Sequence, residues 1–278
     1  LAAMPIAAAS TFTAINVSSI TVDWQENGNP GGTIYQVQAS TSADFIPVHE
    51  EWQSANSQLS FITLSPNVTY YARVRAKNAG NIYTPFLEMG WTMTLPDPPL
   101  ALPYTAVSTT SLVANWTRES NPGHTVFIAE IDDDPAFASV NNTSITLNAS
   151  AYFGNLALNA TYYARVKARN LLGQETGYTS LASTVTLTNT PVAAPLTFAA
   201  VDVSSMSVDW LANNNPDGTR YEAQVSTMPD FTVLTESSRT VLTQATFLTL
   251  QPNTTYFLQI KAINASNTDS AYLQPGST

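Results

Sequence analysis

The chain contains one short segment written three times, and no other feature constrains the fold as strongly. The copies are VTYYARVRAKN, ATYYARVKARN and TTYFLQIKAIN, at residues 68–78, 160–170 and 254–264. Three tryptophans, Trp24, Trp116 and Trp210, follow the same period, with spacings of 92 and 94 residues. That period is longer than a solenoid repeat and fits a small complete domain. The 278 residues therefore predict three copies of one domain in tandem.

Proline-rich joints divide the chain where this period requires boundaries. They read LPDPPLALP and TPVAAP, at residues 95–103 and 190–195. Because proline restricts the backbone, these joints are stiffer than a glycine–serine linker. The predicted repeats are residues 1–97, 98–190 and 191–278. At Thr278 the first two repeats would begin TMTL and TVTL, so we expect repeat 3 to lack its final strand and the chain to be part of a longer array.

Each repeat is predicted to consist of short antiparallel strands. Between residues 164 and 169, Ala, Val and Ala alternate with Arg, Lys and Arg. Alternation with a period of two indicates a strand with one buried and one exposed face. An Asn-Pro turn, written NPGG, NPGH or NPDG, recurs at residues 29–32, 121–124 and 215–218. No segment has a persuasive helical period, so we expect essentially no helix.

These features resemble the fibronectin type III family, and the likeness covers nearly the whole chain. It rests on the tryptophan of the second strand, on the repeated strand quoted above and on a Leu-x-Pro-x-x-x-Tyr turn. The turn reads LSPNVTY, LALNATY and LQPNTTY, and the middle copy lacks the proline. The resemblance implies an all-β fold, with three tandem immunoglobulin-like β-sandwiches in a linear array. It also implies a bacterial surface or secreted protein.

The resemblance assigns structural roles to two aromatic residues in each repeat. The tryptophan fills the space between two sheets, and the tyrosine hydroxyl forms a hydrogen bond with upstream backbone. The predicted structural core residues are Trp24, Trp116, Trp210, Tyr70, Tyr162 and Tyr256. Phenylalanines also recur at a fixed offset, and we expect them to close the same core; they are Phe45, Phe137 and Phe231.

The composition excludes several classes of protein. There is no cysteine, which excludes disulfides and thiolate metal sites. The net charge of −10 argues against nucleic-acid binding, because that requires clustered Lys and Arg to neutralise phosphates. No apolar run reaches the roughly 18 residues of a membrane span, so no membrane insertion is expected. Abundant Ser, Thr and Asn with scarce Lys and Arg favour an extracellular or cell-surface protein.

Catalytic and metal-binding motifs find little support. The two histidines, His49 and His124, occupy non-equivalent positions in different repeats, and no nucleophile elbow or phosphate loop is present. The acidic run DDDP at residues 132–135 lacks the spaced oxygen ligands of a calcium loop, so we interpret it as a solvated turn. We therefore predict a protein that is not an enzyme, with no cofactor and no metal.

The first candidate binding surface is the basic ladder formed by the repeated strand. Seven of the ten Lys and Arg residues lie on it, namely Arg73, Arg75, Lys77, Arg165, Lys167, Arg169 and Lys261. One interpretation is a solvated outer face, in which the long side chains cover the sheet and pair with Glu130 and Glu222. The other is a docking face for an acidic glycan or protein. We favour the first, because charges on a mid-sheet strand also oppose aggregation.

Two further tryptophans, Trp52 and Trp91, form the second candidate. Neither has an aromatic counterpart, since the aligned positions are Ser144, Ser238, Ser183 and Ser277. A structural role should recur in all three repeats, and these residues do not. They are candidates for stacking on a sugar ring, with Tyr83 or Phe86 nearby. The alternative is local packing at a sheet edge or against the next repeat.

The leading functional prediction is a non-catalytic structural, adhesive or spacer segment of a larger extracellular multi-repeat protein. The first alternative is an accessory, carbohydrate-binding array of a secreted polysaccharide-degrading enzyme. The second is a self-assembling extracellular filament in which a neighbour supplies the strand expected to be missing after Thr278. The expected partners are a protein or glycan ligand and further repeats of the same chain.

Overall fold

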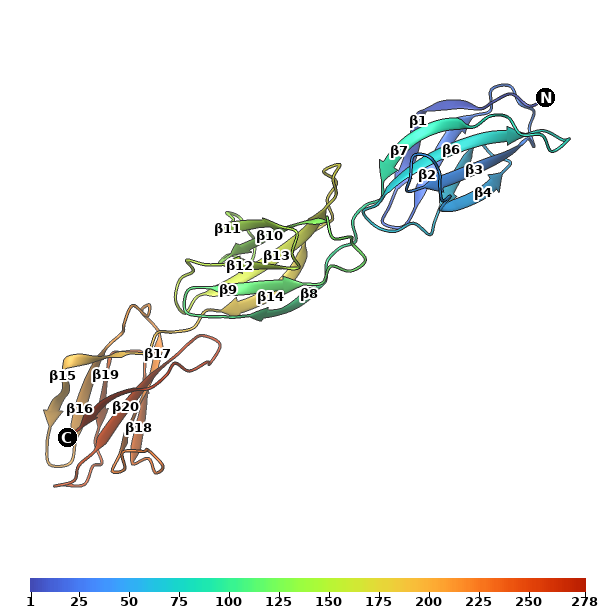
Figure 1. Ribbon diagram of the computed structural model, residues 1–278. Coiled ribbons are helices and arrows are strands. Elements are labelled where there is room, and N and C mark those ends of the chain that lie inside the picture. Colours follow the sequence, from blue (N-terminus) through green and yellow to red (C-terminus); the bar gives the residue numbers. More distant parts are fainter.

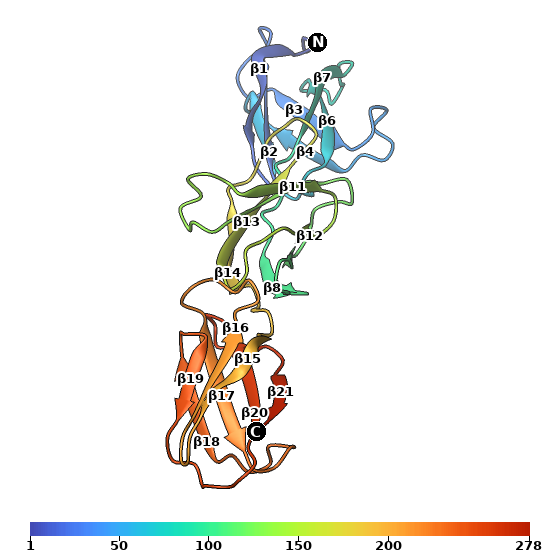
Figure 2. The ribbon, with the colours of Figure 1, turned by 90° about the vertical axis from the view of Figure 1, so that its left-hand side faces the viewer.

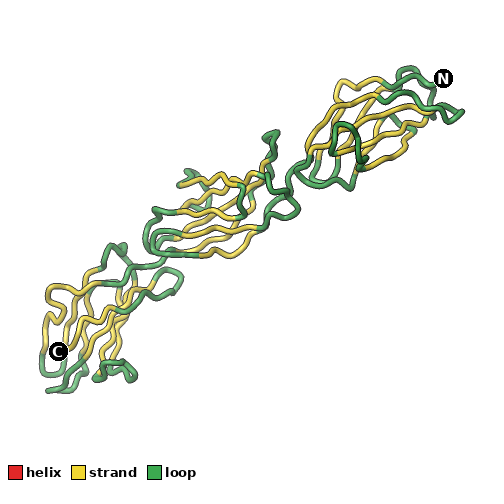
Figure 3. Tube along the Cα trace, viewed as in Figure 1, coloured by secondary structure: helices red, strands yellow, loops and turns green.

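The computed structural model describes residues 1–278 and consists of strands, turns and loops throughout (Figure 3). The strands form three β-sandwiches that follow one another end to end, with the two termini at opposite ends of the molecule (Figure 1). The turned view in Figure 2 keeps this order, so the array does not fold back on itself. No helix that could cross a bilayer is present. The all-β prediction is confirmed.

Every repeat is built from a three-stranded and a four-stranded antiparallel sheet. The strands of repeat 1 are β1 (Ile6–Ile15), β2 (Ile20–Gln25), β3 (Ile34–Ser40), β4 (Glu50–Ser54), β5 (Gln58–Phe61), β6 (Thr69–Lys77) and β7 (Leu87–Met93). They are ordered β1-β2-β5 in one sheet and β4-β3-β6-β7 in the other. The repeated strand identified in the sequence is β6, which lies in the middle of the larger sheet.

The other two repeats have the same strand order. The strands of repeat 2 are β8 (Ala101–Thr105), β9 (Leu112–Trp116), β10 (Val126–Asp132), β11 (Asn142–Thr146), β12 (Ser150–Phe153), β13 (Thr161–Arg169) and β14 (Thr179–Val185). Those of repeat 3 are β15 (Val192–Val201), β16 (Met206–Leu211), β17 (Arg220–Ser226), β18 (Glu236–Thr240), β19 (Gln244–Phe247), β20 (Phe257–Ile263) and β21 (Leu273–Ser277).

Repeat 3 contains its final strand, so the prediction that it lacks one is wrong. β21 pairs antiparallel with β20, with Phe257 opposite Ser277 and Ile260 opposite Leu273. The prediction failed because the last strand starts upstream of the TMTL and TVTL segments, and Pro275 hides the strand pattern of LQPGS. Proline is tolerated here because β21 is an edge strand with a bulge.

The core of each sandwich closes around its own tryptophan. Trp24, Trp116 and Trp210 are buried, and each packs against one aromatic ring of the facing sheet at a centroid distance between 5.4 and 5.8 Å. The partner rings belong to Tyr35, Phe127 and Tyr221. The indole N–H of all three tryptophans has no hydrogen-bond acceptor, so these side chains stabilise the fold through apolar area.

The repeated tyrosine fixes the turn before the long strand. Its hydroxyl oxygen accepts a hydrogen bond from the backbone N–H five residues upstream, at 2.9, 2.9 and 2.8 Å in the three repeats. The pairs are Ser65 with Tyr70, Ala157 with Tyr162, and Gln251 with Tyr256. This bond joins the turn to the strand that follows and aligns the central strand of the larger sheet.

Candidate functional site

The basic ladder of repeat 1 is covered by aromatic rings. The Arg73 guanidinium lies 4.0 Å from the Phe45 ring centroid and 4.1 Å from that of Phe86. Arg75 lies 4.4 Å from Phe86 and 4.0 Å from Tyr83. Guanidinium groups and rings therefore alternate along the outer face of the sheet. Each such contact contributes about 0.5–1 kcal/mol at an exposed site.

This stack corrects the expectation that the repeated phenylalanines close the core. Phe45 and Phe137 instead pack on the outer face, against Arg73 and Arg165. Phe45 is buried beneath Arg73, Phe137 and Phe231 are partly buried, and none of the three belongs to the core cluster of its repeat. The fixed spacing of the phenylalanines therefore marks a shared position outside the core.

The ladder of repeat 2 combines rings with carboxylates. Arg165 lies 2.7 Å from Glu130 and 4.0 Å from the Tyr178 ring. Lys167 lies 2.5 Å from Glu175, and this hydrogen bond raises the pKa of Lys167 above its ordinary value. Arg169 reaches the same Glu175 carboxylate at 3.9 Å. The cations named as docking candidates in repeats 1 and 2 are thus engaged by side chains of their own repeat.

Trp52 and Trp91 are half exposed but lie apart. They are on β4 and β7, the opposite edge strands of one sheet, so about 14 Å of sheet separates their backbones. Trp52 is paired with Val37, whose side chain faces the core, and its indole N–H donates to Glu50 at 2.9 Å. Trp91 is paired with Tyr71 on the outer face. The structure does not bring the two tryptophans together as one sugar platform.

The acidic run of repeat 2 holds no metal-like cluster. No group of three His, Asp or Glu side chains is arranged to hold a metal ion. Asp132 is 1% exposed, which corrects the interpretation of the run as wholly solvated. One of its oxygens accepts a hydrogen bond from the Asp134 backbone N–H at 3.1 Å. The carboxylate therefore holds the turn that follows β10.

Each joint between repeats is held by a joint clamp, which we define as two asparagine side chains that cross it. At the first joint, Asn67 donates to the Thr125 hydroxyl at 2.7 Å, and Asn170 donates to the Thr94 carbonyl at 3.4 Å. At the second joint, the equivalent pairs are Asn159 with Thr219 at 3.1 Å and Asn264 with the Thr186 carbonyl at 3.2 Å. The same side chains thus connect successive sandwiches in the same way.

The asparagine of the Asn-Pro turn fixes the linker itself. Asn121 accepts from the Asp97 backbone N–H at 2.8 Å and donates to the Asp97 carbonyl at 2.7 Å. Asn215 makes the same pair of bonds with the backbone of Asn189, both at 2.8 Å. Two hydrogen bonds on one linker residue favour a single arrangement of the linker backbone. Sequence reasoning found these asparagines as repeat markers but missed this role.

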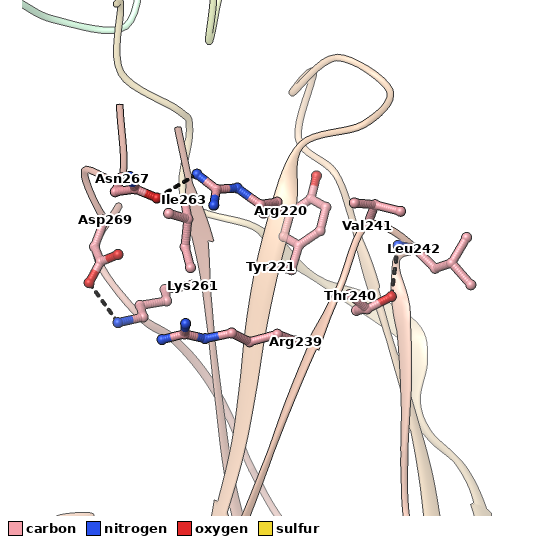
Figure 4. A pocket seen from close by; sticks show the side chains of 10 residues that line it. All are labelled: Arg220, Tyr221, Arg239, Thr240, Val241, Leu242, Lys261, Ile263, Asn267 and Asp269. Carbon is pink, nitrogen blue, oxygen red and sulfur yellow. Dashed lines mark hydrogen bonds and ion pairs between the residues drawn. The ribbon is translucent and has the colours of Figure 1, made fainter. Parts of the chain in front are cut away.

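Repeat 3 carries a hollow that the sequence did not suggest. Its volume is about 950 Å³, and Figure 4 shows its lining, which includes Arg220, Arg239, Lys261, Val241, Leu242 and Asn267. Arg220 begins β17, Arg239 lies on the edge strand β18, and Lys261 lies on β20. The hollow thus gathers three cations from three neighbouring strands. No motif links them, because they are up to 41 residues apart.

The cations of the hollow are unequally neutralised. Glu222 is shared by Lys261 at 3.2 Å and Arg239 at 3.4 Å, while Asp269 pairs with Lys261 at 2.6 Å. Burial alone would lower the pKa of Lys261, but its hydrogen bonds with Asp269, Tyr272 and Glu222 raise it. Arg220 donates only to neutral oxygens, of Asn264 at 2.9 Å and Asn267 at 2.8 Å. The hollow therefore has one positive charge in excess.

Comparison with known proteins agrees with this architecture. Residues 190–275 match the Fibronectin type III domain family. Repeats 1 and 2 have the strand order of this matched repeat, so the chain is a tandem of fibronectin type III-like sandwiches, and the predicted fold class is confirmed. No curated protein matches the chain.

Two solved structures with fibronectin type III domains are similar to the chain. One contains the FN1–FN3 domains of chicken CNTN1, with 16% identity, coverage of 99% of this chain and 98% of that one, and a TM-score of 0.30. The other is a segment of two fibronectin type III domains from chicken tenascin, with 15% identity, coverage of 66% and 99%, and a TM-score of 0.45.

Proposed function

We propose that this chain is a non-catalytic spacer segment of a larger extracellular multi-repeat protein. The observation that supports the proposal is the joint clamp, which recurs at both joints with equivalent residues. A spacer holds its two ends apart, so it needs length and a limited range of angles between its units. Three sandwiches in line give a length on the order of 90 Å, and hydrogen-bonded joints favour one orientation over many.

The extracellular setting of the proposal rests on composition. The chain is rich in Ser, Thr and Asn, has a net charge of −10, and folds without cysteine. Fibronectin type III domains serve structural and adhesive roles in many multi-domain proteins. A segment with few side chains suited to catalysis fits such a role. A bacterial surface protein is the source that we infer from the sequence resemblance.

Removing the corner asparagines tests the spacer role. Replacing Asn67 and Asn159 by Ala removes one half of each joint clamp, so the domains should reorient more freely. Small-angle scattering should show a broader distribution of end-to-end lengths, and NMR relaxation should show repeats that tumble more independently. If the wild-type repeats already tumble independently, the proposal is wrong.

The equivalent corner of repeat 3 supplies a matched control. Asn253 has a φ of 51°, as Asn67 does, and Asn159 has a φ of 50°, but Asn253 bonds to no other repeat. Asn253→Ala therefore carries the same local backbone cost without loss of a joint contact. Its scattering profile should match that of the wild type.

A second candidate, carbohydrate binding, rests on the half-exposed Trp91 beside Tyr71. A glycan array screened with the wild-type chain and with Trp91→Ala and Trp52→Ala tests each tryptophan separately, because they lie on opposite edges. Binding that survives both substitutions would remove this candidate. A filament formed by donation of a missing strand loses its basis, because β21 already occupies that position.

A further inference from the structure

The hollow of repeat 3 differs from the same place in the other repeats. The positions of Arg220 and Arg239 are occupied in repeat 1 by Ile34 and Gln53, and in repeat 2 by Val126 and Ile145. Repeats 1 and 2 have the same strand order as repeat 3, although they lack these two arginines. The two guanidinium groups are therefore not required to form the fold, and another role has to explain them.

The charges of the hollow suit an anion. Figure 4 shows the Arg220 guanidinium extending to Asn267 and the Arg239 guanidinium extending toward Lys261. Arg220 is held in place by neutral acceptors at 2.8 and 2.9 Å and makes no ion pair, so its charge is oriented but not neutralised. Arg239 is 75% exposed in its side chain and only loosely paired with Glu222. Guanidinium groups of this kind bind carboxylates with two parallel hydrogen bonds.

The rest of the lining is aliphatic. Val241 and Leu242, in the turn after β18, are 56% and 64% exposed and line the same hollow as the two arginines. The aromatic ring in the lining, Tyr221, is buried in the core and offers no face for a sugar to stack on. In addition, β18 is the outer strand of its sheet, so its free edge is open to a further extended chain.

We propose that this hollow binds an acidic peptide segment in which two carboxylates flank an aliphatic side chain. One carboxylate pairs with Arg220 and the other with Arg239, and the aliphatic side chain packs on Val241 and Leu242. The volume of about 950 Å³ is at the upper end of ordinary ligand sites, which span roughly 300–1,000 Å³. The proposal goes beyond the spacer role, because it assigns to repeat 3 a recognition function that repeats 1 and 2 do not have.

NMR titration of the whole chain tests the site. The probe is a capped pentapeptide with two glutamates and a central leucine, and the comparison peptide has glutamines in place of the glutamates. The acidic peptide should shift amide signals of β17, of the turn after β18 and of residues 261–269, and the shifts should weaken at high salt. The glutamine peptide should leave them unchanged. Equal binding of the two peptides, or no shift at millimolar acidic peptide, would overturn the proposal.

Substitutions that recreate repeat 1 sharpen the test. Arg239→Gln and Arg220→Ile install the residues found at positions 53 and 34, and each should weaken peptide binding about tenfold. Leu242→Asn installs the residue of position 56 and should weaken it severalfold. Arg169→Gln, in repeat 2, changes the net charge equally and should have no effect. An equal effect of Arg169→Gln would mean that binding follows net charge, and would overturn the site.

Two controls keep the result interpretable. Arg239 is mostly exposed, so Arg239→Gln tests the site even if Arg220→Ile disturbs the bonds to Asn264 and Asn267. Digalacturonate serves as the acidic sugar probe. Tighter binding of digalacturonate than of the peptide at the same residues would overturn the peptide assignment. Arg220 donates to the carbonyl of Asn264, a residue of the second joint clamp, so the independent test of the spacer role is the orientation at the first joint, which Asn67→Ala changes.

Discussion

The outer faces of repeats 1 and 3 use equivalent strands for different purposes. In repeat 1, Arg73 and Arg75 extend from the middle strand β6 and are enclosed by rings of Phe45, Phe86 and Tyr83. Both guanidinium groups of this ladder are therefore flanked by aromatic rings. The result is a closed, self-contained face.

In repeat 3 the cations occupy other positions of the sheet than in repeat 1. The position of Arg73 is held by Gln259, which donates to Gln224 at 2.7 Å instead of stacking on a ring. The guanidinium groups come from Arg220 and Arg239, at the start of β17 and on β18. One ring, that of Tyr272, lies 5.3 Å from Lys261. The face is open where that of repeat 1 is closed.

The two faces of this sandwich are under separate constraints. The inner face repeats the same tryptophan, the same tyrosine corner and the same alternation of buried apolar residues in every repeat. The outer face keeps only its pattern of exposure and is free to change its chemistry. A ligand site can therefore arise on one repeat without cost to the shared core.

The largest expected effect tests whether the inner faces are truly equivalent. Trp24→Ala and Trp210→Ala should each lower the free energy of unfolding of their own repeat by about 3–5 kcal/mol. Backbone amide signals in NMR spectra report each repeat separately during denaturation, including repeat 3, which has no tryptophan besides Trp210. The repeats that keep their tryptophan should unfold at an unchanged denaturant concentration. A much smaller cost in one of the two repeats would mean that their cores are not equivalent.

The inner face could be predicted from the sequence because its signals are local and repeated. The alternation along the strand at 164–169 and the spacing of the tryptophans each report burial directly. The final strand of repeat 3 was missed for the opposite reason. Pro275 and Gly276 break the local pattern, and β21 is fixed by its pairing with residues of β20 that lie 13 to 20 positions upstream.

The joints and the hollow could not be predicted in the same way. Asn67 was interpreted as a turn-former, and its φ of 51° agrees with that. Its side chain also reaches Thr125, 58 residues away in the next repeat, and no local pattern encodes such a contact. The hollow likewise combines Arg220 and Arg239 from separate strands, so its charge is visible only once the sheet is assembled.

A smaller effect tests how much the closed face of repeat 1 contributes to stability. Phe86→Leu removes the ring shared by Arg73 and Arg75 and should lower the free energy of unfolding of repeat 1 by about 1–2 kcal/mol. Tyr272→Leu is the matched change in repeat 3, where one ammonium group lies 5.3 Å from the ring, and should cost less. Denaturation followed at the Trp24 and Trp210 indoles compares them. Equal costs would contradict the distinction between closed and open faces.

The smallest effect concerns the carboxylate that holds the open face together. Burial alone would raise the pKa of Glu222, but hydrogen bonds from Lys261, Gln224 and Arg239 lower it below the ordinary value. A carboxyl group with a lowered pKa stabilises the folded state above its unfolded pKa of about 4.3, and this stabilisation is lost as the pH falls through the folded value.

Glu222→Gln installs the residue found at position 36 of repeat 1 and isolates this effect. The stability difference between wild type and variant, measured at the Trp210 indole, should be constant near neutral pH and shrink as the pH falls below about 4. Lys261 keeps Asp269 as a partner in the variant, so the repeat should remain folded. A difference that does not change with pH would mean that Glu222 stabilises repeat 3 through packing rather than through its charge. The distinction between an open face held by ion pairs and a closed face held by rings would then be contradicted.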